Sequence, residues 1–233
     1  MPAIPLPRRH EERDWKFPLA CRNIGRCTLN SKAAPPGYDS RVVRSLGPRE
    51  VGVAVKTAAL REHFSLEFHR TGLLARTLVV SQQIPLPRDK VFAFFEDPRN
   101  LFEITPVWLD FRMVDPLECA VAEGAEFDYT IRWFGVRLRW RSRIIDYHPP
   151  LGFTDVQTRG PFGRWEHLHT FSPHGRDTRM HDRIAFRLPL AAAPVEPLIR
   201  RHLAEIFCYR AERIAQWAAG TMERRLSEGT PSD

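Results

Sequence analysis

Apolar and polar side chains alternate on both sides of the dipeptide Phe134-Gly135, and this alternation is the strongest constraint on how the chain can fold. Because successive side chains of a β-strand point to opposite faces of a sheet, each run predicts a strand with one buried face. The short interruption predicts a tight turn, so the two runs form an antiparallel hairpin. The buried face of this hairpin would carry Phe127, Tyr129, Ile131, Trp133, Val136, Leu138, Trp140 and Ser142.

The other segments after residue 73 extend the hairpin into a mixed domain. A first strand stops at Pro85, and turns rich in proline and glycine separate the later strands. Residues 88–95 predict a helix that ends before Pro98, and residues 100–104 predict a second short helix. The expected strands are residues 74–84, 152–159, 164–171 and 178–188, and the expected terminal helix is residues 195–223.

These elements predict an α+β domain in which a curved, seven-stranded antiparallel sheet wraps around the long C-terminal helix, with two short helices after the first strand. A twisted sheet with one apolar face has to be covered, and only the terminal helix is long enough to cover it. The apolar face of that helix carries small side chains at Ala211 and Ala218. We therefore expect space for a ligand between sheet and helix, with a well-packed core as the alternative.

Residues 1–72 differ from the rest of the chain and form an expected extension that is disordered or poorly ordered. They contain thirteen Lys and Arg and seven acids, and so carry +6 of the chain's net charge of +7. Prolines interrupt every apolar run, and only Val51 to Leu60 and Phe64 to Leu74 have the apolar content to dock as short elements. The folded domain is expected at residues 73–223, followed by a tail at residues 224–233.

The cysteines and the hydropathy pattern bear on the cellular compartment. Cys119 and Cys208 are isolated and only Cys21 and Cys27 lie close together, so we expect no disulfide framework, which suits a reducing cytoplasm. No apolar run reaches the length of a membrane span, and the N-terminus lacks the order of a secretory signal. We therefore expect a cytoplasmic protein. Two alternative roles for the N-terminal extension stay open, a basic tether and a metal knuckle at Cys21 and Cys27.

Short motifs along the domain resemble a known superfamily. They are Val91-Phe92-Ala93-Phe94-Phe95, Pro98-Arg99-Asn100-Leu101, Thr105-Pro106, Phe153 to Gln157, Gly160-Pro161-Phe162 and Trp165-x-His167-x-His169-x-Phe171. Over about residues 76–219 the chain resembles the START-type helix-grip superfamily (SRPBCC), in particular its bacterial polyketide cyclase/dehydrase-like or coenzyme Q-binding-like branch. The resemblance implies a deep apolar cavity for lipids, polyketides, quinones or hormones, with catalysis in some members and carriage in others. It implies the fold more strongly than the function.

Polar side chains form a row on the apolar face of the later strands. Turns at residues 160–163 and 173–176 predict that His167 lies opposite Asp155 on one side and opposite Asp182 on the other. His169 lies two residues along on the same face. Burying an unpaired carboxylate or imidazole is costly, so the row must be hydrogen-bonded internally, hydrated or bound to something.

Four interpretations of this polar row stay open. It is a self-satisfied buried network, or it recognises a carbonyl or hydroxyl group of a ligand. It performs general acid/base chemistry through His167, with Asp182 holding the tautomer, as an aldol cyclisation or dehydration requires. It holds a metal through two histidines and a carboxylate, although their i, i+2 spacing follows from any alternating strand. We expect no metal ion and no cofactor.

The function that we expect is binding of a hydrophobic small molecule, of the lipid, quinone or polyketide class, in an internal cavity. The alternative is a cyclase or dehydratase that acts in this cavity through His167 and Asp182. The expected ligand contacts are Phe127, Tyr129, Ile131, Trp140, Asp155, Gln157, Trp165, His169, Met180, Ile184, Phe207 and Ala211.

The outward face of the hairpin carries the arginine row Arg137, Arg139, Arg141 and Arg143. A solvated surface paired with nearby acids is the expected role, and weak contact with an anionic surface or an acidic partner is the alternative. Nucleic acid is not expected as a partner, because Trp133, Trp140 and Trp165 are predicted to point inward and cannot stack on bases. The sequence leaves the oligomeric state open.

Overall fold

An antiparallel sheet of eight strands forms the body of the protein in the computed structural model, which describes residues 63–114 and 120–228. All described residues belong to the compact unit Asp39–Asp233. The strands lie in the order β1-β2-β8-β7-β6-β5-β4-β3. They are β1 (Phe64–Arg70), β2 (Ala75–Ile84), β3 (Arg112–Met113), β4 (Glu126–Trp133), β5 (Val136–His148), β6 (Gly152–Arg159), β7 (Arg164–His174) and β8 (Asp177–Arg187).

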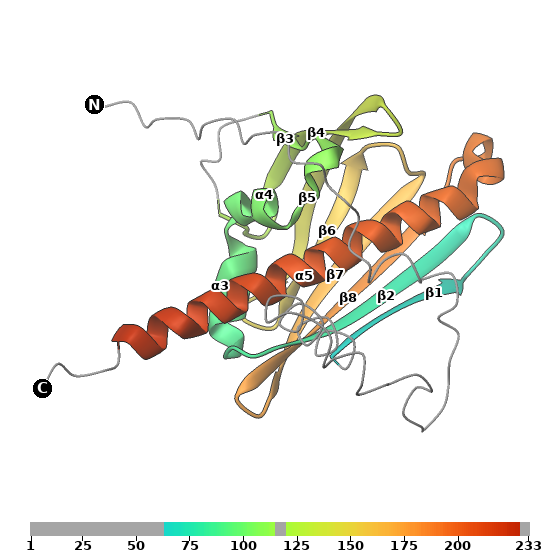
Figure 1. Cartoon of the computed structure of the whole chain (residues 1–233). Coiled ribbons are helices and arrows are strands. Elements are labelled where there is room, and N and C mark those ends of the chain that lie inside the picture. The colour runs from blue at the N-terminus through green and yellow to red at the C-terminus, as the bar shows by residue number, and fades with distance from the viewer. Residues whose placement is uncertain (1–62, 115–119, 229–233) are drawn as a thin grey trace, which may run out of the picture. The chain divides into compact units, whose positions relative to one another are not determined.

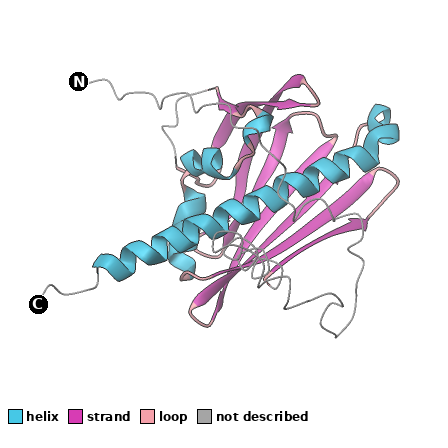
Figure 2. Ribbon diagram, in the orientation of Figure 1, coloured by secondary structure: helices cyan, strands magenta, loops and turns pink. Residues whose placement is uncertain are grey.

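One long helix, α5 (Glu196–Glu228), crosses the inner face of the sheet, as Figures 1 and 2 show. Short helices lie beside α5 (Figure 1). These are the α-helices α3 (Arg88–Glu96) and α4 (Leu101–Ile104) and the 3-10 helices η2 (Pro98–Asn100) and η3 (Val107–Leu109), while a further 3-10 helix, η4 (Leu190–Val195), precedes α5. The predicted helix-grip α+β fold is confirmed.

The central hairpin has the predicted turn. Trp133 pairs with Val136 across Phe134-Gly135, and both turn residues have positive φ, 49° and 79°. The tight two-residue turns that match strand twist require this conformation, which glycine adopts without steric cost. The alternation therefore places Phe127, Ile131 and Trp140 on the buried face, as expected.

The sheet has eight strands and not the expected seven, because β1 and the two-residue β3 at its edges join the six strands located in the sequence. β1 pairs with β2 from Phe64↔Gln82 to Arg70↔Arg76, so the segment Phe64 to Leu74 does dock as a short element. The sheet thus begins before residue 73, and α5 extends past residue 223. Residues 1–62, with Cys21 and Cys27, lie outside the described residues, and the division of the chain into extension, domain and tail stays a prediction.

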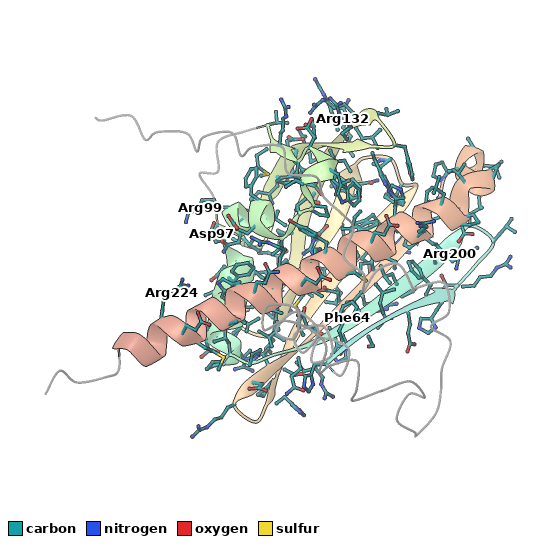
Figure 3. All side chains as sticks on the ribbon, viewed as in Figure 1. Phe64, Asp97, Arg99, Arg132, Arg200 and Arg224 are labelled. Atoms are coloured by element: carbon teal, nitrogen blue, oxygen red, sulfur yellow. The ribbon has the colours of Figure 1, made fainter. Side chains whose placement is uncertain are left out.

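The turn from α3 into η2 is fixed locally. The Asp97 side chain accepts a hydrogen bond from the backbone N–H of Arg99 at 3.0 Å and forms an ion pair with its guanidinium at 2.6 Å (Figure 3). A short acidic side chain before a helical turn satisfies a donor that has no partner within the helix. With this break in place, α3 turns Phe92 and Phe95 into the core.

The apolar face of α5 has the predicted helix period. Leu203, Phe207, Ala211, Ile214 and Ala218 are all buried against the sheet. The Gln82 side chain on β2 also donates a buried hydrogen bond to the Ala211 carbonyl at 2.9 Å. Burying each large apolar side chain stabilises the fold by about 1.5–3 kcal/mol, so this face anchors the helix across the sheet.

The arginine row is largely neutralised on the outer face of the sheet. Three of its members make ion pairs with N···O distances of 2.5 Å, namely Arg137–Asp110, Arg141–Asp128 and Arg143–Glu126. Arg132 extends from the same hairpin toward solvent (Figure 3). Such exposed pairs contribute at most about 1 kcal/mol each, but they reduce the positive charge available to an anionic surface. Contact of the arginine row with such a surface stays a prediction.

Candidate functional site

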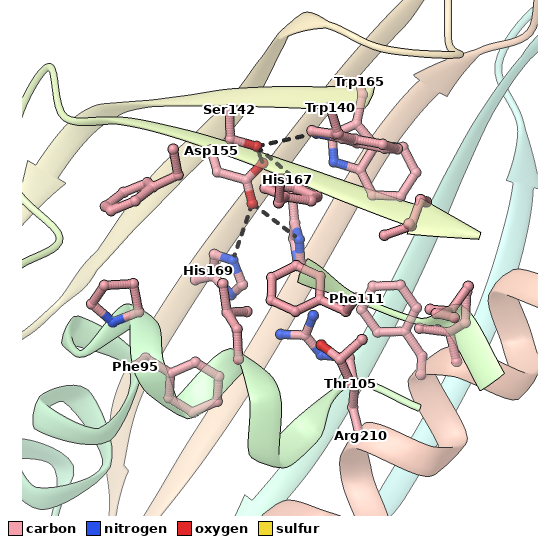
Figure 4. A pocket seen from close by; sticks show the side chains of 18 of the residues that line it. Phe95, Thr105, Phe111, Trp140, Ser142, Asp155, Trp165, His167, His169 and Arg210 are labelled. Atoms are coloured by element: carbon pink, nitrogen blue, oxygen red, sulfur yellow. Dashed lines mark hydrogen bonds and ion pairs between the residues drawn. The ribbon is translucent and has the colours of Figure 1, made fainter. Parts of the chain in front are cut away.

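A cavity of about 180 Å³ lies between the inner face of β4–β7 and helix α5 (Figure 4). It is closed on its third side by residues of α3, α4 and η3. Predicted ligand contacts that line it are Phe127, Tyr129, Ile131, Trp140, Asp155, Trp165, His169 and Phe207, together with the predicted catalytic residue His167. A helix that spans a strongly curved sheet does not fill the space at its centre, which is why the cavity forms there.

Aromatic rings make one end of the cavity rigid. Trp140 stacks on Tyr129 at 5.9 Å and meets Trp165 edge-on at 5.2 Å between ring centroids. Phe162 packs on Trp165 at 4.8 Å and on Trp133 at 5.7 Å. Offset and edge-to-face pairs of this kind are favourable, and they hold flat apolar surfaces toward the space.

Other predicted contacts lie outside this cavity. Met180, Asp182 and Ala211 line a separate cavity of about 10 Å³, the size of one water molecule, on the β8 side of α5. Ile184 is fully buried in the core. Gln157 binds the backbone of Phe162, donating to its carbonyl at 2.8 Å, and so fixes the β6–β7 turn. None of these residues lines the large cavity.

Arg210 is the main cavity residue that the sequence analysis missed. It lies on α5 at the helix spacing of Leu203 and Phe207, on the face predicted to be apolar, and it points into the cavity (Figure 4). Its position, at the helix period from Leu203 and Phe207, could have identified it in the sequence as a charged residue on the apolar face. The other lining residues not predicted are Phe95, Pro98, Leu101, Thr105, Leu109, Phe111, Val121, Trp133, Ser142, Ile144, Phe153, Phe162, Leu203 and Ile206.

The polar row is confirmed as a cluster, but one register prediction was wrong. Asp155 pairs with His167 as expected, whereas Asp182 lies opposite His169 and Ile184 lies opposite His167. The β7–β8 turn consists of Gly175-Arg176, with positive φ of 64° at Gly175, and not of a loop centred one residue earlier. A one-residue shift of the turn moves each paired partner by two positions and keeps the face unchanged.

Two carboxylates enclose the two stacked imidazoles, whose centroids are 3.8 Å apart. Asp182 Oδ1 lies 2.8 Å from His169 Nδ1 and 3.3 Å from His167 Nε2. On the opposite edge of the rings, Asp155 Oδ2 lies 3.5 Å from His167 Nδ1 and 3.7 Å from His169 Nε2. The rings and Asp182 are buried, while Asp155 is partly exposed to the cavity.

The charges of this cluster follow from burial and proximity. Burial favours neutral forms, but the carboxylates of Asp182 and Asp155 outweigh it at His169 and raise its pKa. Burial and the neighbouring His169 charge lower the pKa of His167. Burial opposes ionisation of Asp182 and Asp155, yet the nearby histidines hold the pKa of both carboxyls below the usual range.

A hydrogen-bonded chain connects the aromatic end of the cavity to this cluster. Trp140 Nε1 donates to Ser142 Oγ at 3.2 Å, and Ser142 Oγ donates to Asp155 Oδ1 at 3.2 Å (Figure 4). The Tyr129 hydroxyl lies 3.4 Å from the same Ser142 oxygen. These contacts orient the Asp155 carboxylate, whose other oxygen faces the two histidines.

Arg210 brings a positive charge to the opposite wall. Its guanidinium lies over the Phe207 ring at 5.4 Å, and its Nε is buried without a hydrogen bond. Among the described residues no carboxylate lies within 4.0 Å of it. Burial lowers the pKa of Arg210 and the charges of Asp182 and Asp155 oppose that shift, but a guanidinium stays charged in proteins.

An aromatic cavity with one polar wall, enclosed by a sheet that grips a helix, defines a helix-grip protein with an internal binding site. The family described as "Polyketide cyclase / dehydrase and lipid transport" matches residues 84–207, and this chain belongs to it. The predicted resemblance to the polyketide cyclase/dehydrase-like branch is thereby confirmed. Hydrophobic ligand binding is the general property that this membership indicates.

Two solved structures are similar to this chain. Protein Ms6760 from Mycobacterium smegmatis has a TM-score of 0.52 at 16% identity, covering 66% of this chain and 94% of its own, and this likeness concerns the fold alone. TTHA0849 from Thermus thermophilus has a TM-score of 0.47 at 19% identity, covering 59% of this chain and 96% of its own. No curated protein matches the chain, and no helix in its described part is long and apolar enough to cross a membrane.

Proposed function

We propose that this protein binds a compact, hydrophobic molecule of the quinone or aromatic polyketide type, with an acidic or carbonyl oxygen held by Arg210. The observation that carries the proposal is the combination of an aromatic cavity with a guanidinium that has no carboxylate partner among the described residues. Flat aromatic walls select flat guests, and a small number of polar groups fix their orientation.

The size of the cavity supports a small guest. Its volume of about 180 Å³ is close to that of an engineered apolar cavity of about 150 Å³ that binds benzene. A guest with one or two fused rings matches this volume, whereas a long acyl chain exceeds it. Quinones and aromatic polyketides therefore suit the cavity better than extended lipids do.

The charge on the cavity wall supports an oxygen-bearing guest. Arg210 is partly exposed, but its buried Nε has no hydrogen bond and gains one by binding an anion or a carbonyl oxygen. Arg210 faces the cavity from the helix side, so an oxygen bound there leaves the rest of the guest against Tyr129, Trp140 and Trp165.

The test is isothermal titration calorimetry with 2-naphthoate and with its neutral analogue 2-naphthylmethanol. We expect the wild-type protein to bind naphthoate more tightly, and Arg210→Gln to weaken naphthoate by about ten- to a hundredfold because a charged hydrogen bond is lost. The matched control is Arg213→Gln, three residues along α5, where the arginine instead pairs with Glu103 at the surface. Equal naphthoate affinity in Arg210→Gln and the wild type would contradict the assigned role.

A second candidate function is cyclase or dehydratase chemistry in the same cavity. The arrangement that favours it is an imidazole, His169, which lies in the wall of the cavity and is held 2.8 Å from Asp182. In the sequence analysis His167 had this role, but His167 lies farther from Asp182, at 3.3 Å. Loss of turnover in His169→Ala with naphthoate binding retained supports this activity, since a carrier shows no turnover.

A further inference from the structure

We propose that Asp155, His167 and His169 form a binding site for a divalent first-row transition metal that opens into the cavity. One ligand atom from each residue lies within 4.8 Å of the other two. Asp155 Oδ2 lies 3.5 Å from His167 Nδ1 and 3.7 Å from His169 Nε2. All three residues line the cavity, so a bound ion would be reachable by a guest. This inference goes beyond ligand binding, because it assigns a second chemical species to the polar wall.

The two imidazoles have too few N–H groups for the contacts that they make with the carboxylates. Two imidazoles make four N···O contacts with two carboxylates, at distances from 2.8 to 3.7 Å. A neutral imidazole has one N–H and one lone pair, and a protonated one has two N–H groups, so even with His169 protonated at least one lone pair is directed at a negative oxygen. A cation between the Asp155 oxygen and the ring nitrogens removes this repulsion without further protons.

A metal ion at this position would leave Asp182 to accept the remaining N–H groups of both histidines. With a metal on Nδ1 of His167 and Nε2 of His169, each ring keeps its hydrogen on the opposite nitrogen, and both N–H groups face Asp182 Oδ1. Carboxylates that accept the second N–H of metal-binding histidines are a common feature of metal sites. As the cluster stands, His167 Nε2, His169 Nδ1 and Asp182 Oδ1 are buried and have no well-aligned hydrogen bond.

The distances between the donor atoms also suit a metal ion. Metal–nitrogen and metal–oxygen bonds of about 2.0–2.1 Å at a tetrahedral angle put neighbouring donor atoms about 3.3–3.5 Å apart. The separations between Asp155 Oδ2 and the two nitrogens are 3.5 and 3.7 Å, which is close to these values, and one donor atom from each residue lies within 4.8 Å of the others. Three protein donors from paired strands leave the cavity side of the ion open to water or to an oxygen of a guest.

The donor set indicates the class of metal. Two imidazoles and one carboxylate suit Zn²⁺, Fe²⁺, Co²⁺ or Mn²⁺, whereas Mg²⁺ and Ca²⁺ prefer oxygen donors. The negative charges of Asp155 and Asp182 balance a divalent ion, and Arg210 then adds a positive charge to the same cavity. An anionic guest would restore neutrality between the ion and Arg210, in agreement with the oxygen-bearing guest proposed above.

The experiment is a titration of the full chain, first treated with a chelator, with Co²⁺, whose visible absorption reports its coordination. We expect one Co²⁺ per chain at this site, with no thiolate charge-transfer band, which separates the site from the cysteines. His167→Ala/His169→Ala should abolish the visible spectrum, and Asp182→Asn should weaken Co²⁺ binding by about ten- to a hundredfold. His181→Ala, on β8 beside Asp182 but exposed, is the matched control and should leave binding unchanged.

Two further measurements keep the result interpretable. Asp155→Asn keeps the size of the side chain, so loss of Co²⁺ binding in this variant at an unchanged melting temperature of the metal-free protein is attributable to the ligand. Absence of saturable Co²⁺ binding at millimolar concentration, or a spectrum unchanged in His167→Ala/His169→Ala, overturns the proposal. Naphthoate binding by chelator-treated protein tests the proposed function separately, because the aromatic walls and Arg210 need no metal.

Discussion

Replacing Trp140 by Ala removes the central ring of the aromatic wall and the first donor of the chain that leads to Asp155. The side chain is 6% exposed and contacts the rings of Tyr129, Phe162 and Trp165. Truncation of a buried tryptophan costs about 3–5 kcal/mol of unfolding free energy. We expect a loss near the upper end of this range. The space left by the indole ring joins the existing cavity, and the surrounding sheet cannot move inward to fill it.

A graded series separates packing from hydrogen bonding. Trp140→Phe retains a ring and loses the donor to Ser142, so we expect a loss of about 2 kcal/mol, of which about 1 kcal/mol comes from the hydrogen bond. Unfolding in urea, followed by circular dichroism, measures both variants without relying on tryptophan fluorescence. In folded Trp140→Ala we expect naphthoate affinity to fall by about three- to tenfold, the value of one aromatic contact.

The matched control for this series is Trp217→Ala, because Trp217 packs on Phe94 at 4.2 Å and does not line the cavity. We expect it to reduce stability and to leave naphthoate affinity unchanged. A decrease of less than about 1 kcal/mol in the free energy of unfolding of Trp140→Ala would contradict this expectation. So would a folded Trp140→Ala variant that binds naphthoate with the wild-type affinity.

Two smaller perturbations test other parts of the structure. A Cβ on Gly152 would lie 2.1 Å from the His169 carbonyl oxygen, so we expect Gly152→Ala to displace β7. The variant should have a lower melting temperature and weaker Co²⁺ and naphthoate binding. A variant as stable as the wild type would show that this contact is absent. Burial and a hydrogen bond to Glu96 raise the pKa of Tyr147 to about 12, above the value of about 10 for an unfolded tyrosine. The contribution to stability is therefore complete below pH of about 10 and is lost as pH rises toward about 12, and Tyr147→Phe should remove this decline in urea titrations.

The strand and helix order was predictable because it depends on local periodicity. Alternation around Phe134-Gly135 reports which side of a strand is buried, and the helix period through Leu203 and Phe207 reports which side of α5 faces the sheet. The same alternation put His167 and His169 on the inner face before their partners were known. These properties follow from backbone geometry, which each segment has without its neighbours.

The cavity and its charges depended on the tertiary structure. The sequence could not show that Met180 and Ala211 lie outside the large cavity while Phe111 and Phe153 line it, because this depends on where α5 crosses the curved sheet. The partner of His169 depended on one turn residue, Gly175, that moved the register by two. A cavity is the difference between the space that packed elements enclose and the side chains that fill it, so it is a property of the assembled fold and not of any segment.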